Sequence, residues 1–307
     1  MKEYAIETIG LTKKYGEQFS VNKLSLNVPR EKIYGLLGRN GAGKTTAMRL
    51  LLNLARPTSG TIKLLGNDYK NNPKNIYCRV GSIIETPGFY DNLTGFENLN
   101  IIARLRGRFQ KGRIDRALEL VGLNTETQKL FSNYSLGMKQ RLGIAAAIMH
   151  KPELLILDEP INGLDPIGIH EIRKFLLSLC KTQGITIFIS SHVLNEIEQL
   201  ADIIGVMHGG RLIDEVDMSE LRKRNRQYVE FDVSKINTAT MLLERQFGIS
   251  DYTVCNDNTI KVYGCIDRRG EINKCFITHD LTVTTVKVSE EKLEDYFSGL
   301  IGGGGIG

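Results

Sequence analysis

The stretch IYGLLGRNGAGKTT occupies residues 33–46 and determines the fold prediction. Within it, residues 38–45 fit the pattern G-x-x-x-x-G-K-[ST]. The apolar run Ile33–Leu37 before the pattern predicts a buried strand, and Met48, Leu51 and Leu52 after it indicate a helix. A glycine-rich turn joining a strand to a helix is the simpler interpretation, but the lysine and threonine in register favour a phosphate-binding loop.

Each part of this loop has a physical role. Glycines let the backbone wrap a phosphate chain with its N–H groups turned inward, and the helix N-terminus adds the positive end of its dipole. Lys44 can reach the phosphates and the Thr45 hydroxyl can bind Mg²⁺. The predicted contacts with a nucleotide are Gly38, Arg39, Asn40, Gly41, Ala42, Gly43, Lys44, Thr45 and Thr46.

A pair of carboxylates follows a second apolar run. Residues 154–160 read LLILDEP, so a buried strand at 154–157 is followed by Asp158 and Glu159. In open α/β sheets ligands bind at the carboxyl ends of strands. Asp158 can hold Mg²⁺ through water, and Glu159 can act as general base on the attacking water. A buried strand ending in a polar turn is common, but downstream of a phosphate loop the pair supplies the missing metal and base functions.

Three further pieces narrow the prediction. Ser135 is placed to cap a helix that begins SLGMKQR, and Gly137 lies two residues on, so this helix start could bind a second phosphate. One nucleotide does not need two such helix starts from one chain, whereas two chains face to face would use both. Asp165 follows the carboxylate pair, and His192 follows the predicted strand 185–189, where it can reach a γ-phosphate. In isolation, capping and structural roles are the default for these residues.

The chain divides near residue 218. Strand-like and helix-like stretches alternate before it, which predicts an α/β domain around a mostly parallel sheet over residues 1–217. A basic segment at 221–226 follows. After it, short strands and helices predict a small α+β domain over 218–300, with the strands at 228–233, 252–255, 259–263 and 282–288 and the helices at 239–247, 269–278 and 289–300. The glycine-rich residues 301–307 are predicted to be disordered.

Composition excludes several classes. The 307 residues are 41% hydrophobic and 24% charged, which is typical of a globular protein with a core. A net charge of +5 is too small to indicate nucleic-acid binding by itself. The five scattered cysteines predict reduced thiols in the cytosol. No apolar run approaches the roughly 20 residues that a membrane span requires. If the protein acts at a membrane, we therefore expect it to do so through a partner protein.

With these motifs in this order, the sequence resembles the ATP-binding domains of ABC transporters over nearly all of residues 1–217. Lys44 and Thr45 match Walker A, and Asp158 and Glu159 match Walker B. Ser135 to Gly137 match the signature of the family, and Asp165 matches its D-loop. His192 matches the switch histidine, and Tyr15 matches the aromatic residue that stacks on adenine. In the signature, leucine stands where the family usually has its first glycine. Tyr15 could also be a surface tyrosine. The resemblance implies a P-loop NTPase of the ABC type with a helical subdomain, the cofactors ATP and Mg²⁺, and an ATPase that dimerises under a separate integral membrane permease.

One departure from the family pattern is informative. Glu85 stands where ABC ATPases usually carry the Q-loop glutamine. This glutamate, the sequence IETPGFY at 84–90 and the C-terminal appendage resemble the bacitracin-resistance and lantibiotic-immunity exporters. That resemblance implies export of a peptide antibiotic, with the chain at the cytoplasmic face of a bacterial membrane. Glu85 is then a candidate for catalytic, metal-contacting and coupling roles, although an isolated substitution is the alternative.

Other functions stay open at this stage. An exporter with another cargo would share every motif. ABC proteins that act on ribosomes normally carry two motor domains, and we find one. Chromosome-maintenance ATPases have long heptad runs, and GTPases need N-K-x-D, and we find neither. We interpret the basic runs at 104–108 and 222–226 as solvated surface and expect no nucleic-acid partner.

Overall fold

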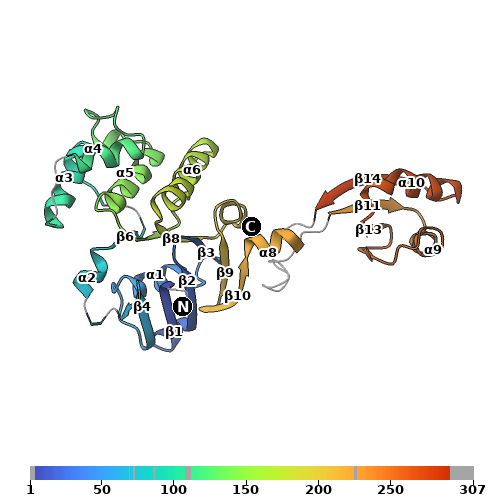
Figure 1. Ribbon diagram of the computed structural model, residues 1–307, viewed down its shortest axis with the longest axis horizontal. Helices are drawn as coiled ribbons and strands as arrows, with labels where there is room; N and C mark the ends of the chain where they lie inside the picture. Colours follow the sequence, from blue (N-terminus) through green and yellow to red (C-terminus); the bar gives the residue numbers. More distant parts are fainter. Residues whose placement is uncertain are drawn as a thin grey trace. The chain divides into compact units, whose positions relative to one another are not determined.

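The computed structural model describes residues 4–68, 70–71, 73–85, 88–107, 112–224 and 227–290. The chain splits into two compact units, and the division falls between Met218 and Ser219 (Figure 1). The sequence-based division was one residue earlier. Each unit has its own buried core and is described by itself.

The first unit is built on a six-stranded sheet in the order β10-β9-β3-β8-β7-β6. Neighbouring strands from β9 to β6 run parallel, and β10 is antiparallel to β9. Every residue of β3 and β7 is buried, as expected for central strands covered on both faces. The strands are β3 (Ile33–Leu37), β6 (Val80–Ile83), β7 (Leu154–Asp158), β8 (Thr186–Ser191), β9 (Ile203–His208) and β10 (Arg211–Asp217).

A second, antiparallel sheet packs against this core. Its order is β2-β1-β4-β5. Side chains from both sheets and from helix α1 (Lys44–Leu51) form one buried cluster, which includes Leu26, Met48 and Phe188. The strands are β1 (Tyr4–Tyr15), β2 (Gln18–Pro29), β4 (Ser59–Leu64) and β5 (Asn67–Asp68).

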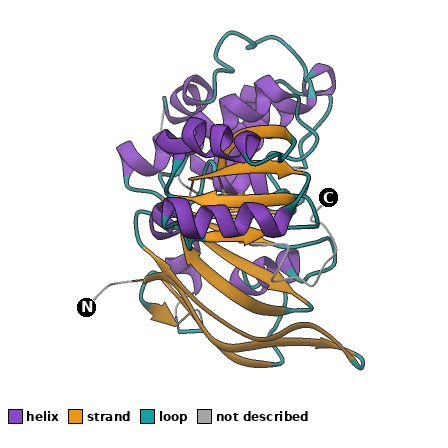
Figure 2. Cartoon of the chain, turned by 90° about the vertical axis from the view of Figure 1, so that its right-hand side faces the viewer, coloured by secondary structure: helices purple, strands orange, loops and turns teal. Residues whose placement is uncertain are grey.

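A helical region lies between β6 and β7 in the sequence. Figures 1 and 2 show it at one end of the first unit and the antiparallel sheet at the other. Helix α3 begins with a capping box, in which Thr94 accepts from the Glu97 N–H and the Glu97 carboxylate accepts from the Thr94 N–H. The region holds α3 (Gly95–Leu105), α4 (Arg113–Leu120), the short 3-10 turn η1 (Phe131–Asn133) and α5 (Leu136–Ile148).

Further helices lie in the first unit, and one more follows β10, with all its residues after Met218 in the second unit. They are α2 (Pro73–Tyr77), α6 (Pro166–Gln183), α7 (Leu194–Glu198) and α8 (Met218–Arg224). Among the residues that the structure describes, no helix is long and apolar enough to cross a membrane.

Residues 227–290 of the second unit form a four-stranded antiparallel sheet in the order β12-β13-β11-β14, with two α-helices in the chain order βαββαβ. This is the ferredoxin-like arrangement. Phe231 and Phe276 meet edge to face in its core, with their ring centroids 5.4 Å apart. The elements are β11 (Gln227–Val233), α9 (Ile236–Phe247), β12 (Tyr252–Val254), β13 (Thr259–Tyr263), the 3-10 turn η2 (Ile266–Arg268), α10 (Arg269–Thr278) and β14 (Val283–Glu290).

The sequence-based prediction of the last helix was wrong at its start. Ser289 and Glu290 belong to β14, where they pair with Tyr228 and Gln227 of β11. Ladder pairing with a central strand therefore overrides the local helical pattern at these two residues. The rest of the predicted helix and the predicted disordered tail at 301–307 lie outside the described residues.

Candidate nucleotide site

The loop between β3 and α1 has a shape that only glycine permits at two positions. Gly41 and Gly43 have φ of +82° and +102°, in the left-handed region. At Gly43 there is also no room, because a Cβ would lie 2.2 Å from the Ser20 carbonyl oxygen. The Ser20 side chain reaches the same loop and donates to Thr46 Oγ1 over 2.8 Å. Ser20 of strand β2, in the antiparallel sheet, thus packs against the loop and the start of α1.

Lys44 begins α1 and is 5% exposed. Its ammonium donates to the carbonyl oxygens of Gly38 at 2.6 Å and Arg39 at 3.3 Å, and it lies 3.3 Å from Oε1 of Glu159. These three contacts match the three N–H donors of a lysine. The loop's own carbonyl groups therefore hold the cation at the mouth of the loop, in the first turn of the helix that also contains Thr45 and Thr46.

Strand order brings the distant motifs together. Strand β8 lies between β3 and β7, and all three run parallel. Leu37 is paired with Ser191 and Asp158 with Ser190. The residues that follow each strand therefore emerge at one edge of the sheet: the phosphate loop after β3, Glu159 after β7 and His192 after β8.

Glu159 is the centre of this cluster. Its carboxylate contacts Lys44, His192 Nδ1 at 2.9 Å and the Asn162 amide at 3.3 Å. An ionised carboxylate only accepts hydrogen bonds, so His192 Nδ1 is the donor when it bonds to Glu159. The opposite ring nitrogen, Nε2, is then the atom of His192 available to a ligand. Glu159 adopts a φ of +45°, a conformation that is uncommon outside glycine.

A serine that the sequence analysis did not single out joins the two acidic residues. Ser190 Oγ donates to Asp158 Oδ1 over 2.6 Å and accepts from the Glu159 N–H over 2.9 Å. Asp158 is 7% exposed, so its carboxylate is fixed at the end of β7. Ser190 lies 31 residues or more from both partners in the chain, and only the pairing of β7 with β8 reveals the contact.

The signature stretch and Asp165 share a separate groove. Ser135 caps α5 by accepting from the Met138 N–H, and Asp165 caps α6 by accepting from the Gly168 N–H. Both residues and Gly137 line a cavity of about 470 Å³. Glu159 begins the loop that Asp165 ends, so this loop connects the groove with the Lys44–Glu159–His192 cluster.

The last two predicted site residues lie at the periphery. Tyr15 ends β1, is half exposed and has the Lys13 ammonium 4.7 Å from its ring centroid. Glu85 follows β6, whose pairing with β7 places it at the same sheet edge as Glu159. Its side chain, however, is 64% exposed and forms an ion pair with Arg49 in the last turn of α1. The structure brings Lys44, Asp158, Glu159 and His192 together, and it gives Glu85 a different partner.

Comparison with known proteins identifies relatives of this chain. The family model described as "ABC transporter" matches residues 21–162. The chain is 64% identical to the bacitracin transport ATP-binding protein BcrA of Enterococcus faecalis, over 99% of this chain and 98% of that protein. It is 44% identical to the lantibiotic transport ATP-binding protein SrtF of Streptococcus pyogenes, over 68% of this chain and 90% of that one.

A solved structure of an ATP-binding subunit of an ABC transporter is 29% identical, with a TM-score of 0.63, over 72% of this chain and 92% of that one. The phosphate loop, the acidic pair and the histidine thus lie on a fold that such subunits share. The chain belongs to the ABC transporter family as an ATP-binding subunit, an ATPase coupled to transport.

Proposed function

We propose that this chain powers a bacterial exporter that removes a peptide antibiotic of the bacitracin or lantibiotic type. The observation that carries the proposal is the match to BcrA along 99% of this chain, because it includes the second unit as well as the ATPase unit. We take the cargo from the names of BcrA and SrtF, which are transport proteins for bacitracin and for a lantibiotic. The chain would act at the cytoplasmic face of the membrane, where a separate permease subunit forms the pathway.

We assign the chemistry to the cluster at the sheet edge. Lys44 leaves the loop carbonyl groups to hold the β- and γ-phosphates, and the backbone N–H groups of the glycine loop bind the remaining phosphate oxygens. Glu159 accepts the proton of the attacking water, and the His192 ring keeps Glu159 oriented through its Nδ1 contact. The exposed ring of Tyr15 stacks on the adenine.

Mg²⁺ fits the residues present. The Asp158 carboxylate, held by Ser190, and the Thr45 hydroxyl are hard oxygen donors, and Mg²⁺ typically uses one or two such protein ligands with the substrate phosphates. Bound there, Mg²⁺ would neutralise charge on the phosphates. The carboxylate of Glu85 is paired with Arg49. A contact between Glu85 and Mg²⁺ therefore stays a prediction.

We further propose that the active sites are shared between two copies of the chain. The groove of Ser135, Gly137 and Asp165 lies apart from the Lys44 cluster, and an N-capped helix start of this kind suits an anion presented by a second copy. A Lys44→Ala chain and a Ser135→Arg chain should each be inactive. Mixed, they form some dimers with one intact site, so partial recovery of ATPase activity is expected. An active monomer would contradict sharing.

Co-purification tests the cellular role. The tagged chain, expressed with its neighbouring genes, should bring down a hydrophobic membrane subunit from detergent extracts. Recovery of ribosomes or DNA without such a subunit would contradict the proposal.

A further inference from the structure

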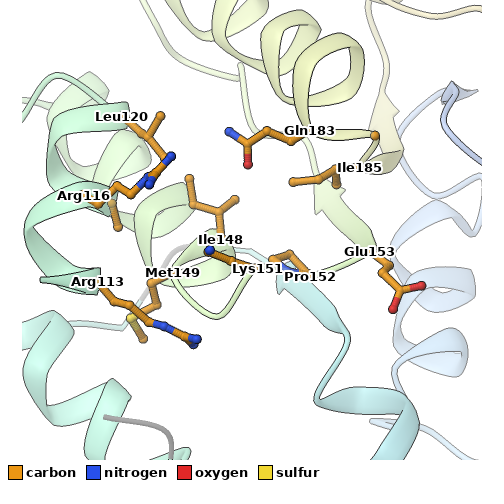
Figure 3. A pocket seen from close by; sticks show the side chains of 12 residues that line it. Arg113, Arg116, Leu120, Ile148, Met149, Lys151, Pro152, Glu153, Gln183 and Ile185 are labelled. Carbon is orange, nitrogen blue, oxygen red and sulfur yellow. The ribbon is translucent and has the colours of Figure 1, made fainter. Parts of the chain in front are cut away.

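A cavity of about 370 Å³ lies on the first unit (Figure 3). Its floor includes Pro152 and Glu153, which precede β7, and Gly184 and Ile185, which precede β8. The nucleotide cluster lies at the opposite ends of the same strands. Five or six residues of strand separate the two places by about 15–20 Å. A ligand in this cavity would therefore not overlap the phosphate loop.

Three cationic side chains surround the cavity. Arg113 and Arg116 are three residues apart on α4 and so share one face of the helix. Lys151 comes from the turn between α5 and β7, and Gln183, the last residue of α6, adds an amide opposite them. In Figure 3 the two arginines come from α4, whereas Lys151 and Gln183 reach the same space from other segments.

The negative charge of Glu153, which also lines the cavity, is balanced by two arginines. Glu153 accepts two 2.6 Å hydrogen bonds from Arg79 and lies 3.3 Å from Arg30. The hydrogen bonds from Arg79 lower the pKa of Glu153, so it is ionised and committed to these arginines. In Figure 3 its carboxylate points away from Arg113 and Arg116. Positive charge therefore dominates the cavity.

The walls are apolar. The side chains of Ala117, Ile148, Met149 and Ile185 are buried there, and Leu120 is partly exposed at the rim. The volume is at the lower end of the range for small-molecule sites, which are mostly apolar with a few placed polar groups. Two guanidinium groups favour phosphate or carboxylate, which they can bind bidentately.

We propose that this cavity binds a small amphiphilic anion, a phosphate or carboxylate on an apolar chain. The anionic group pairs with Arg113, Arg116 and Lys151, and the chain lies on the wall formed by α4, the end of α5 and Ile185. Such a ligand would join α4 to the two turns that precede β7 and β8. Its source is either a soluble metabolite or the headgroup region of an anionic lipid.

Octyl phosphate is a suitable probe. We expect saturable binding by calorimetry with the full chain, measured in saturating ADP so that the phosphate loop is occupied. Arg113→Gln combined with Arg116→Gln should weaken binding by about tenfold or more, the factor expected for loss of a charge-assisted hydrogen bond. Lys151→Asn should weaken it too. Asparagine tolerates the left-handed backbone at this position, where φ is +56°, so the fold should be retained.

Controls and outcomes separate the alternatives. Lys174→Ala removes an exposed cation of α6 outside the cavity and should leave binding unchanged. Inorganic phosphate and octanol should each bind much more weakly than octyl phosphate. Recruitment of the chain to phosphatidylglycerol vesicles, lost in the double arginine variant, would identify lipid as the source; probe binding without recruitment would identify a soluble ligand. The proposal is wrong if octyl phosphate does not bind, if the arginine variants bind it as well as the wild type, or if phosphate alone binds equally tightly.

Discussion

Replacing Glu159 with glutamine removes one proton acceptor and changes little else. The carboxylate contacts Lys44 at 3.3 Å, His192 at 2.9 Å and Asn162 at 3.3 Å. Glutamine has the same length and keeps one oxygen that can accept from His192 or Asn162. Lys44 keeps the carbonyl oxygens of Gly38 and Arg39. The fold and the phosphate loop should therefore persist in Glu159→Gln.

The size of the effect follows from the role of the group. Loss of a general base typically lowers the rate about 10²–10⁴-fold, which corresponds to about 3–5 kcal/mol on the barrier. The loss of the Lys44 ion pair should change the free energy of unfolding by only about 1 kcal/mol, because Glu159 is 22% exposed and the lysine retains its other partners. Glu159→Gln should thus lower the ATPase rate strongly while it changes the free energy of unfolding only slightly.

Steady-state phosphate release from the purified chain measures the rate, and thermal unfolding measures stability. Binding of a fluorescent ATP analogue should be retained, and size-exclusion chromatography with ATP and Mg²⁺ should show an accumulated dimer. Glu119→Gln, on the exposed face of α4, is the matched control and should hydrolyse ATP at the wild-type rate. Turnover of Glu159→Gln near the wild-type rate would remove Glu159 from its assigned role.

Three shorter predictions test other parts of the account. Gly43→Ala should abolish ATP binding and lower the melting temperature more than Gly41→Ala does. Both glycines have positive φ, but a Cβ at Gly43 would lie 2.2 Å from a carbonyl oxygen, whereas a Cβ at Gly41 would meet open space. Equal melting temperatures of the two variants would contradict this reasoning. Glu85→Gln should reduce survival of cells challenged with the peptide antibiotic more than it reduces the ATPase rate of the purified chain; wild-type values for both would refute a coupling role. Glu153→Gln should lower the free energy of unfolding by less than about 1 kcal/mol at pH 7, since the pair is partly exposed. The pKa of Glu153 is lowered in the folded chain, so this difference should be present above the unfolded pKa and disappear as the pH falls through the folded one, and urea titrations at several pH values would show a persistent difference if the reasoning is wrong.

Much of the first unit could be predicted from local pattern. Continuous apolar runs identified β3 and β7 because strands covered on both faces have no polar side to interrupt them. The convergence of Lys44, Asp158 and His192 also followed, since parallel strands end at one edge of the sheet. In the second unit, the same approach failed at Ser289 and Glu290, where pairing across the sheet determines the backbone.

Contacts between distant segments could not be predicted. Ser190 joins Asp158 and Glu159 only because β8 lies beside β7, and nothing in the local sequence specifies that neighbour. The pairing of Glu85, which follows β6, with Arg49 in the last turn of α1 likewise depends on the tertiary structure. Glutamate at position 85 indicated a departure from the family pattern, but not its partner.

Transport itself tests the central claim most directly. Inside-out membrane vesicles that contain the permease and this chain should accumulate bacitracin or a lantibiotic when ATP and Mg²⁺ are added. Accumulation should be lost with the Glu159→Gln chain, although that chain still assembles with the permease. ATP-driven accumulation that persists with Glu159→Gln, or no accumulation of either peptide by the wild-type assembly, would contradict the account.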